Sequence, residues 1–332
     1  MWRAARYALV GVVLVLLIAA GVGTLIGGGI LHPQRKALAP EHVHRAGQAF
    51  ARIGAAREDI EVRAADGAVL RGWKVRPAPD GSSVSIAGSQ AQAEGSDWVL
   101  LFHGVSDNRM GVIGHAEILL RNGYSVVMMD ARAHGASDGS LATYGWKERQ
   151  DTQAIVNALM ASERVHCLFA LGESMGAALA LQSAAVEPRI TGVVAESSFS
   201  DLREVSYDYA GLRVSAWLGK TLFRPASWMA IRTAGKEGGF RAEDVSPEKA
   251  VASRGFPVLL ICGMRDRNIP ARHSERLYAA ARGVKELWLV PGAGHSSALG
   301  TAPAEFEQRV VTFLKHVHAT GTPRELPEDE EN

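Results

Sequence analysis

The chain has 332 residues, with 36 Lys plus Arg against 35 Asp plus Glu, so its formal net charge is only +1. A nearly neutral chain has no long-range field to attract nucleic-acid phosphates, which disfavours a nucleic-acid-binding protein. Its 47% hydrophobic content is too high for a disordered protein, and its two cysteines are too few for a disulfide scaffold or a cysteine-rich metal site. We expect one large α/β domain with appendages.

The amino-terminal region contains an uncharged stretch from Ala8 to Leu31. As a helix it would be about 36 Å long, enough to cross a hydrocarbon core of about 30 Å. The sequence therefore predicts a single-pass membrane anchor over residues 1–32. A cleaved secretory signal is the alternative, because Ala19 to Gly23 offers small residues to a signal peptidase. Basic residues lie on both sides of the stretch, and we expect the rest of the chain on the extracytoplasmic side.

The next segment, 33–56, is expected to connect the anchor to the main domain through a short amphipathic helix that starts at Pro40. Two strands, Glu58 to Ala64 and Val69 to Arg76, are predicted to pair around a turn at Asp66-Gly67. The stretch from Pro77 to Ser96 is rich in Gly, Ser, Ala and Gln without apolar periodicity, which predicts an exposed loop.

From Trp98 onward, apolar runs of strand length alternate with segments of helical spacing. The predicted strands are Trp98 to Phe102, Tyr124 to Met129, Val165 to Leu171, Ile190 to Ala195, Pro257 to Cys262 and Glu286 to Val290. The predicted helices are Gly111 to Arg121, Trp146 to Met160, Met175 to Val186 and Ala271 to Ala281. Continuous apolar runs indicate strands buried on both faces, and their alternation with helices indicates parallel pairing. The fold class is a doubly wound, mostly parallel α/β sheet.

One long interval interrupts this alternation, between the strand ending at Ala195 and the strand beginning at Pro257. The interval is rich in aromatic residues: Phe199, Tyr207, Tyr209, Trp217, Phe223, Trp228, Phe240 and Phe256. It predicts a helical cap over residues 197–256, above the carboxyl ends of the strands, where such sheets bind ligands. Alternatively, the rings form only the core of the insertion itself. Residues 319–332 are expected to be a solvated acidic tail.

The pentapeptide Gly172-Glu173-Ser174-Met175-Gly176 matches G-x-S-x-G. The match is informative because it lies between a predicted strand and a predicted helix, as a strained strand-turn-helix elbow requires. The flanking glycines leave room for the neighbouring backbone. Ser174 is therefore the candidate nucleophile at the carboxyl edge of the sheet.

A serine hydroxyl needs a base to remove its proton as it attacks. We predict His295, which lies in the Gly-rich turn after the last strand, as the base. Asp266 follows another strand at the same edge and is predicted to orient the histidine, in the order Ser, Asp, His that this architecture imposes. Asp201 is the rival acid.

Two backbone N–H groups should stabilise the negative charge that develops on a substrate carbonyl oxygen. Met175 follows the nucleophile and opens a helix, and Val105 lies in the His103-Gly104-Val105 loop after a strand. We predict Val105 and Met175 as this oxyanion hole, with His103 ordering the loop.

These motifs resemble the α/β-hydrolase superfamily, in particular its cap-bearing serine aminopeptidase-like or membrane-anchored branch. The matching stretches are LLFHGVSDNR from Leu100, MMDARAHGASDG from Met128, TYGWKERQD from Thr143, LGESMGAALAL from Leu171, LLICGMRDRNIP from Leu259 and VPGAGHSSA from Val290. They span about residues 57–318. The resemblance implies serine-based hydrolysis of esters, thioesters or amides, without a metal or an organic cofactor. It also implies that Cys167 and Cys262 lie on strands separated by a third, too far apart for a disulfide.

The predicted function is cleavage of acyl esters or thioesters through an acyl-enzyme on Ser174, with a small-molecule or lipid-like acyl substrate. One alternative is an aminopeptidase, which would need a cap carboxylate to pair with the substrate ammonium group. The candidates for that carboxylate are Glu204, Asp208, Glu237, Glu243 and Asp244. Another alternative, from a different class, is a catalytically silent, membrane-tethered binding module.

Overall fold

The computed structural model describes residues 2–78, 95–212 and 215–320. One eight-stranded sheet forms its centre, with strand order β1-β2-β4-β3-β5-β6-β7-β8. The strands from β4 to β8 pair in parallel, whereas β2 runs antiparallel to both of its neighbours. The predicted mostly parallel α/β sheet is therefore confirmed.

The strands follow the apolar runs of the sequence. They are β1 (Ala56–Arg63), β2 (Val69–Arg76), β3 (Ser96–Phe102), β4 (Ser125–Met129), β5 (Val165–Glu173), β6 (Ile190–Glu196), β7 (Val258–Gly263) and β8 (Lys285–Val290). Every residue of β4 and β7 is buried, because helices cover both faces of the sheet there. The edge strand β1 instead exposes most of its residues and carries charged side chains, as a solvated edge requires.

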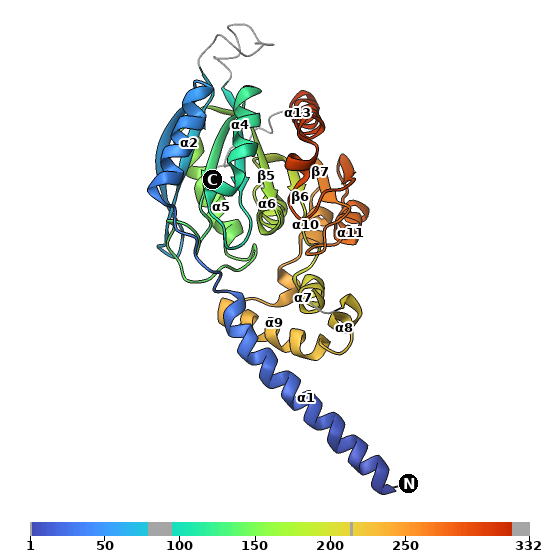
Figure 1. The fold of residues 1–332 in the computed structure, drawn as a ribbon. Coiled ribbons are helices and arrows are strands. Elements are labelled where there is room, and N and C mark those ends of the chain that lie inside the picture. The colour runs from blue at the N-terminus through green and yellow to red at the C-terminus, as the bar shows by residue number, and fades with distance from the viewer. Residues whose placement is uncertain (1, 79–94, 213–214, 321–332) are drawn as a thin grey trace, which may run out of the picture.

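Helices cover the sheet in two layers (Figure 1). One apolar cluster joins the sheet to α2 (Pro40–Arg52), α4 (Ile113–Arg121) and α13 (Pro303–Thr320). The other joins it to α5 (Glu148–Ser162), α6 (Met175–Val186), α10 (Pro247–Ser253) and α11 (Arg272–Ala280). Two short helices, η1 (Arg109–Val112) and α12 (Ala298–Thr301), lie in the connections.

The predicted helical insertion lies between β6 and β7. It contains α7 (Leu202–Gly211), α8 (Ala216–Lys220), α9 (Arg224–Gly238) and η2 (Ala242–Asp244), followed by α10. A third apolar cluster, which includes Phe199, Val205, Ile231 and Phe240, packs α7 against α9, and α8 contacts both of these helices. The last helix, α10, packs instead against α6 and α11. We use "cap" below for α7, α8, α9 and η2.

The amino-terminal helix α1 (Trp2–Ile30) contains nearly all of the uncharged stretch. It runs away from the body of the molecule, so that its amino-terminal end is remote from the sheet, whereas its other end lies beside α9 (Figure 1). In the part of the chain that the structure describes, no helix combines the length and apolar character needed to cross a membrane. The membrane anchor over residues 1–32 stays a prediction.

Three smaller predictions concern the loops and cysteines. Most of the predicted loop from Pro77 to Ser96, and all but Ala319 and Thr320 of the predicted tail, lie outside the described residues. Cys167 and Cys262 are free and buried. Since β6 lies between their strands β5 and β7, the expectation that they form no disulfide is confirmed.

Candidate active site

Ser174 occupies the tight turn between β5 and α6. Its backbone φ of 54° lies in the left-handed region that non-glycine residues seldom adopt. The two flanking glycines are needed, because a Cβ at Gly172 would lie 2.3 Å from the carbonyl oxygen of Gly176. A Cβ at Gly176 would lie 2.1 Å from the carbonyl oxygen of Phe102. This close backbone packing maintains the strained conformation of Ser174. The turn places the serine hydroxyl at the carboxyl edge of the sheet.

The structure brings the three predicted side chains together at this edge. The Ser174 hydroxyl donates to Nε2 of His295 over 2.8 Å, and Nδ1 of His295 donates to Oδ2 of Asp266 over 2.8 Å. The other carboxylate oxygen of Asp266 accepts the N–H groups of Asn268 and Ile269, each at 2.9 Å. These bonds fix the orientation of the carboxylate. Because the carboxylate accepts a hydrogen bond from Nδ1, it favours the His295 tautomer in which Nε2 is free to accept the serine proton.

The turn that carries His295 is tied to the end of β6 by two contacts that the sequence did not indicate. Ser296 N–H donates to Oγ of Ser197 over 3.2 Å, and Ala298 N–H donates to Oε1 of Glu196 over 2.8 Å. Glu196 also accepts the N–H of Ser174 through its backbone carbonyl, at 2.8 Å. One strand end therefore positions both the nucleophile and the histidine turn. The only sequence signal for Glu196 and Ser197 is their place directly after an apolar strand.

Asp201, the rival acid, has a different role. Its side chain accepts the N–H of Arg203 at 2.9 Å and the N–H of Glu204 at 3.4 Å, so it caps the amino terminus of α7. The contact with His295 is made by Asp266.

The two predicted oxyanion-hole residues lie on either side of Ser174. Met175 is the first residue of α6, where N–H groups have no partner within the helix. Val105 follows β3 in a loop that Gly104 brings close, since a Cβ at Gly104 would lie 3.8 Å from that of Ser174. Val105, Ser174 and Met175 all line one cavity, so both backbone segments border the same space.

His103 is buried beneath this loop. Its Nδ1 donates to the carbonyl of Gly104 at 2.8 Å, and its Nε2 accepts the N–H of Ala131 at 3.0 Å. Burial, together with the neighbouring His134 ring, lowers the pKa of His103 to about 4. The ring is therefore neutral with both nitrogens in use, which suits the predicted role in ordering the loop.

The loop after β4 is also held by side chains. Asp130 forms a buried ion pair with Arg109 at 2.7 Å and accepts the N–H of Ala136. Arg132 contacts both oxygens of Asp151, at 2.5 and 2.6 Å. Because these charged groups pair with one another, we interpret them as stabilising the conformation of this loop.

Glu173 is the residue immediately before the nucleophile. Its burial, with a further contribution from the carboxylate of Glu196, raises the pKa of Glu173 to about 7, although His115 nearby opposes the shift. A protonated carboxyl group next to the nucleophile avoids placing an unpaired charge in the interior.

A cavity of about 520 Å³ extends from Ser174 under the cap. It is lined by apolar and uncharged polar residues: Val22, Ile26, Ile30, Val105, Tyr144, Ser174, Met175, Phe199, Leu202, Val205, Ser206, Tyr209, Ala210, Phe223, Ala226, Ser227, Ala230, Ile231 and Ile269. Only Phe199, Tyr209 and Phe223 of the eight aromatic residues in the insertion line it. Both expectations for these rings therefore hold in part, since Phe240 lies in the core of the cap.

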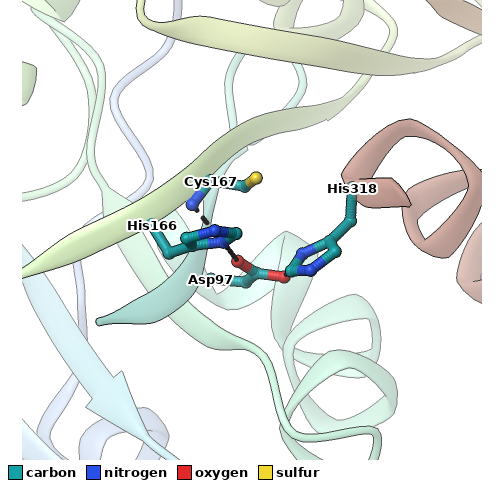
Figure 2. A group of neighbouring side chains, drawn as sticks. All are labelled: Asp97, His166, Cys167 and His318. Atoms are coloured by element: carbon teal, nitrogen blue, oxygen red, sulfur yellow. Dashed lines mark hydrogen bonds and ion pairs between the residues drawn. The ribbon is translucent and has the colours of Figure 1, made fainter. Parts of the chain in front are cut away.

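A second group of chemically versatile side chains lies at the opposite edge of the sheet, near the amino ends of β3 and β5. Asp97, His166, Cys167 and His318 place possible metal-ligand atoms within 4.8 Å of one another (Figure 2). The Asp97 carboxylate already accepts from Nδ1 of His318 at 2.7 Å, from Nδ1 of His166 at 3.2 Å and from the Cys167 N–H at 3.2 Å. Burial raises the pKa of the Cys167 thiol to about 12.

This group has the side-chain types that bind zinc. Both oxygens of its carboxylate already accept N–H groups, and the raised pKa of Cys167 keeps its thiol protonated at neutral pH. We therefore describe it as a hydrogen-bonded cluster that links the end of α13 to the sheet. No local pattern in the sequence indicates it, because its members are far apart along the chain.

Comparison with known proteins agrees with a hydrolase domain. Residues 94–246 match the family described as serine aminopeptidase, S33. The chain is 28% identical to the uncharacterized protein YqkD of Bacillus subtilis over 225 residues, which are 66% of this chain and 72% of the relative. It is 26% identical to the uncharacterized protein YfhR of Escherichia coli K12 over 261 residues, covering 77% of this chain and 80% of the relative.

Solved structures extend the likeness to nearly the whole fold. The esterase Pf2001 of Pyrococcus furiosus superposes with a TM-score of 0.64 at 25% identity, covering 86% of this chain and 97% of the esterase. Est1E of Butyrivibrio proteoclasticus, solved with ferulic acid, shares the fold with a TM-score of 0.57 at 18% identity, over 78% of this chain and 99% of Est1E. The sheet and these structures share an α/β-hydrolase-like fold, and the match over residues 94–246 identifies the chain as a hydrolase with a serine aminopeptidase-like domain.

Proposed function

We propose that the chain hydrolyses carboxylic esters of apolar acyl groups, through an acyl-enzyme on Ser174. The observation that carries the proposal is the hydrogen-bonded series Ser174–His295–Asp266 at the wall of an uncharged, mostly apolar cavity. An acyl chain fits such a cavity because it requires no polar partner, and its burial is favourable in proportion to its area.

The reaction follows from the geometry. His295 Nε2 removes the proton from Ser174 Oγ as this oxygen attacks the ester carbonyl, and the N–H groups of Met175 and Val105 stabilise the resulting oxyanion. The imidazolium then gives that proton to the departing alcohol, which leaves the acyl group on Ser174. A water molecule, deprotonated by the same nitrogen, releases the acid and restores the hydroxyl. The same steps would cleave a thioester, with a thiol as the leaving group.

The lining of the cavity favours an ester over an aminopeptidase substrate. A free amino terminus carries a positive charge, and its burial needs a nearby carboxylate. Among the described residues that line the cavity there is no Asp or Glu. Three of the five candidate carboxylates pair elsewhere: Asp208 with Arg272 and His273, Glu237 with His32, and Glu243 with Arg203.

The decisive experiment compares Ser174→Ala with Ser140→Ala, a control at an exposed serine. Loss of the nucleophile should lower kcat for a p-nitrophenyl ester by about 10⁴-fold or more and abolish labelling by a fluorophosphonate. The control should keep both. Absence of labelling in the wild-type chain would instead favour the silent binding module, and faster turnover of an aminoacyl-nitroanilide than of any acyl ester would favour the peptidase.

We also propose that the uncharged stretch from Ala8 to Leu31 tethers the protein to a membrane, with the hydrolase domain on the extracytoplasmic side. The support is the composition of this stretch and the basic residues at both of its ends. Retention in the membrane pellet after carbonate extraction, with an intact amino terminus by sequencing, is expected. Release of a shortened chain would favour the cleaved signal.

A further inference from the structure

The carboxyl-terminal part of α1 forms one wall of the cavity that contains Ser174. Val22, Ile26 and Ile30 line it, and their spacing of four residues places them on one face of the helix. Eight residues of helix rise about 12 Å, which matches an extended hydrocarbon of roughly ten carbons. A segment whose composition suggested only an anchor therefore contributes side chains to the candidate active site.

The contact between α1 and the cap is close enough to specify small residues. A Cβ at Gly23 would lie 2.3 Å from the carbonyl oxygen of Ala226, and a Cβ at Gly27 would lie 2.5 Å from that of Ala230. Both pairs repeat every four residues, so the backbones of α1 and α9 approach along a ridge of glycine and alanine. Ala226 and Ala230 also line the cavity. The side chains of the α1 wall are therefore held in a defined register against α9.

The end of α1 is fixed to both the cap and the body. The Tyr144 hydroxyl donates to the carbonyl of Ile30 at 2.9 Å, and the Ala142 N–H donates to the carbonyl of Leu31 at 2.8 Å. Leu31 is 0% exposed in the apolar cluster of the cap. His32 contacts Glu237 of α9 at 2.7 Å. These contacts make the α1 wall part of the folded hydrolase.

The exposure of the α1 wall indicates its direction. Ile30 is partly buried beside Tyr144, whereas Val22 is 44% exposed and Ile26 is 56% exposed. The cavity is thus enclosed near the sheet and open toward the outer part of α1. An acyl group with its carbonyl at Ser174 would extend outward along aliphatic side chains, covering those that are now exposed to water.

We propose that Val22, Ile26 and Ile30 bind the distal part of an unbranched acyl chain of about eight to twelve carbons, so that α1 sets the acyl-length preference. The inference rests on the proposed ester hydrolysis and names its substrate class. Each buried methylene contributes about 0.8 kcal/mol, so a wall of this length is sufficient to distinguish long from short acyl groups.

The test compares Ile26→Trp with Leu25→Trp on the full-length chain, at one fixed detergent concentration, with p-nitrophenyl acetate and decanoate. Leu25 is 83% exposed and does not line the cavity, so it is a matched control on the next position of the helix. The indole at position 26 would fill the outer cavity. We expect the ratio of kcat/KM for decanoate to that for acetate to fall at least tenfold in Ile26→Trp and to stay within twofold in Leu25→Trp.

A second pair of variants tests the packing of α1 against α9 without changing a side chain that lines the cavity. Gly27→Leu would force α1 away from α9, whereas Gly28→Leu is the control, because a Cβ at Gly28 would meet nothing within 4 Å. The decanoate-to-acetate ratio should fall only in Gly27→Leu, and this pair decides the matter if Ile26→Trp does not fold. A wild-type chain that cleaves neither ester would overturn the proposed function. Activity with the same ratio in all variants would overturn only the role of α1.

Discussion

The edge of the sheet that carries Ser174 and the cavity under the cap meet at this residue, yet they are built by different means. At the edge, backbone packs against backbone, and a Cβ at Gly172 or Gly176 would collide with a carbonyl oxygen. In the cavity, aliphatic and aromatic side chains from α1, α7 and α9 form a surface without charge. The first region depends on individual residues, and the second depends on total volume and apolar character.

This difference sets how each region should respond to mutation. Changes at the edge act on the transition state and should cost orders of magnitude in rate. Changes in an apolar pocket alter the fit of a few methylenes and should cost about 1–3 kcal/mol in selectivity.

Asp266→Asn should give the largest loss that preserves the shape of the site. An amide can still accept the N–H groups of Asn268 and Ile269, but it no longer holds His295 in the required tautomer or stabilises the imidazolium. We expect kcat/KM for a p-nitrophenyl ester to fall by about 10³- to 10⁴-fold. Asp201→Asn, at the helix cap, should change it by less than about threefold. Equal losses in the two variants would reopen the assignment of the acid.

Gly176→Ala should damage both stability and activity. The added methyl group would lie 2.1 Å from the Phe102 carbonyl oxygen and 2.7 Å from that of His103, neither of which can move without shifting β3. We expect a loss of about 3 kcal/mol or more in unfolding free energy, measured by urea denaturation. Gly47→Ala on α2, where nothing lies within 4 Å, should instead be neutral or stabilising by up to about 1 kcal/mol. A tolerated Gly176→Ala would contradict the close-packed elbow.

Glu173→Gln should change how stability depends on pH. The folded pKa of Glu173, about 7, lies above its ordinary value of 4.5, so the folded chain binds the proton more tightly between these two values. The contribution of Glu173 to stability therefore falls as the pH rises from 4.5 to 7. Glutamine does not ionise, so the variant lacks this fall. Above pH 7 we expect its unfolding free energy to exceed that of the wild type by at most about 3 kcal/mol. Urea unfolding at pH 5 and pH 8 measures it. Glu286→Gln, at an exposed carboxyl of β8, should show no such pH-dependent gain.

Asp97→Ala should have the smallest effect and should spare the chemistry. The change removes the acceptor for His166, His318 and the Cys167 N–H, at the sheet edge opposite Ser174. We expect a loss of about 1–2 kcal/mol in unfolding free energy with kcat unchanged within twofold. Asp59→Ala, an exposed site on β1, serves as the control for a lost surface charge. A large fall in kcat would show that the two edges are coupled.

Much of the fold was predictable because its signals are local. The limits predicted for Met175–Val186 are those of α6, and the six predicted parallel strands fall within a few residues of the observed ones. A strand buried on both faces must be apolar throughout, and a nucleophile elbow must have glycine on both sides. The positions of Ser174, Asp266 and His295 followed from the same rule, since parallel strands deliver their carboxyl ends to one edge.

The features that could not be predicted all depend on contacts between distant segments. Nothing near Glu196 and Ser197 indicates that they hold the His295 turn, and nothing near Asp97 indicates that His318 will contact it. The packing of α10 could not be predicted either, because it follows η2 directly along the chain and yet packs against α6 and α11.

The residue order alone was sufficient to specify the sheet, the elbow and the three side chains that meet there, because each depends on a short pattern with a strict steric or burial requirement. Only the folded chain revealed that the described lining of the cavity holds no charged residue and that Val22, Ile26 and Ile30 of α1 complete its wall. Apolar composition is the same for a membrane span, a core and a binding surface, and what distinguishes them is the partner that covers each face.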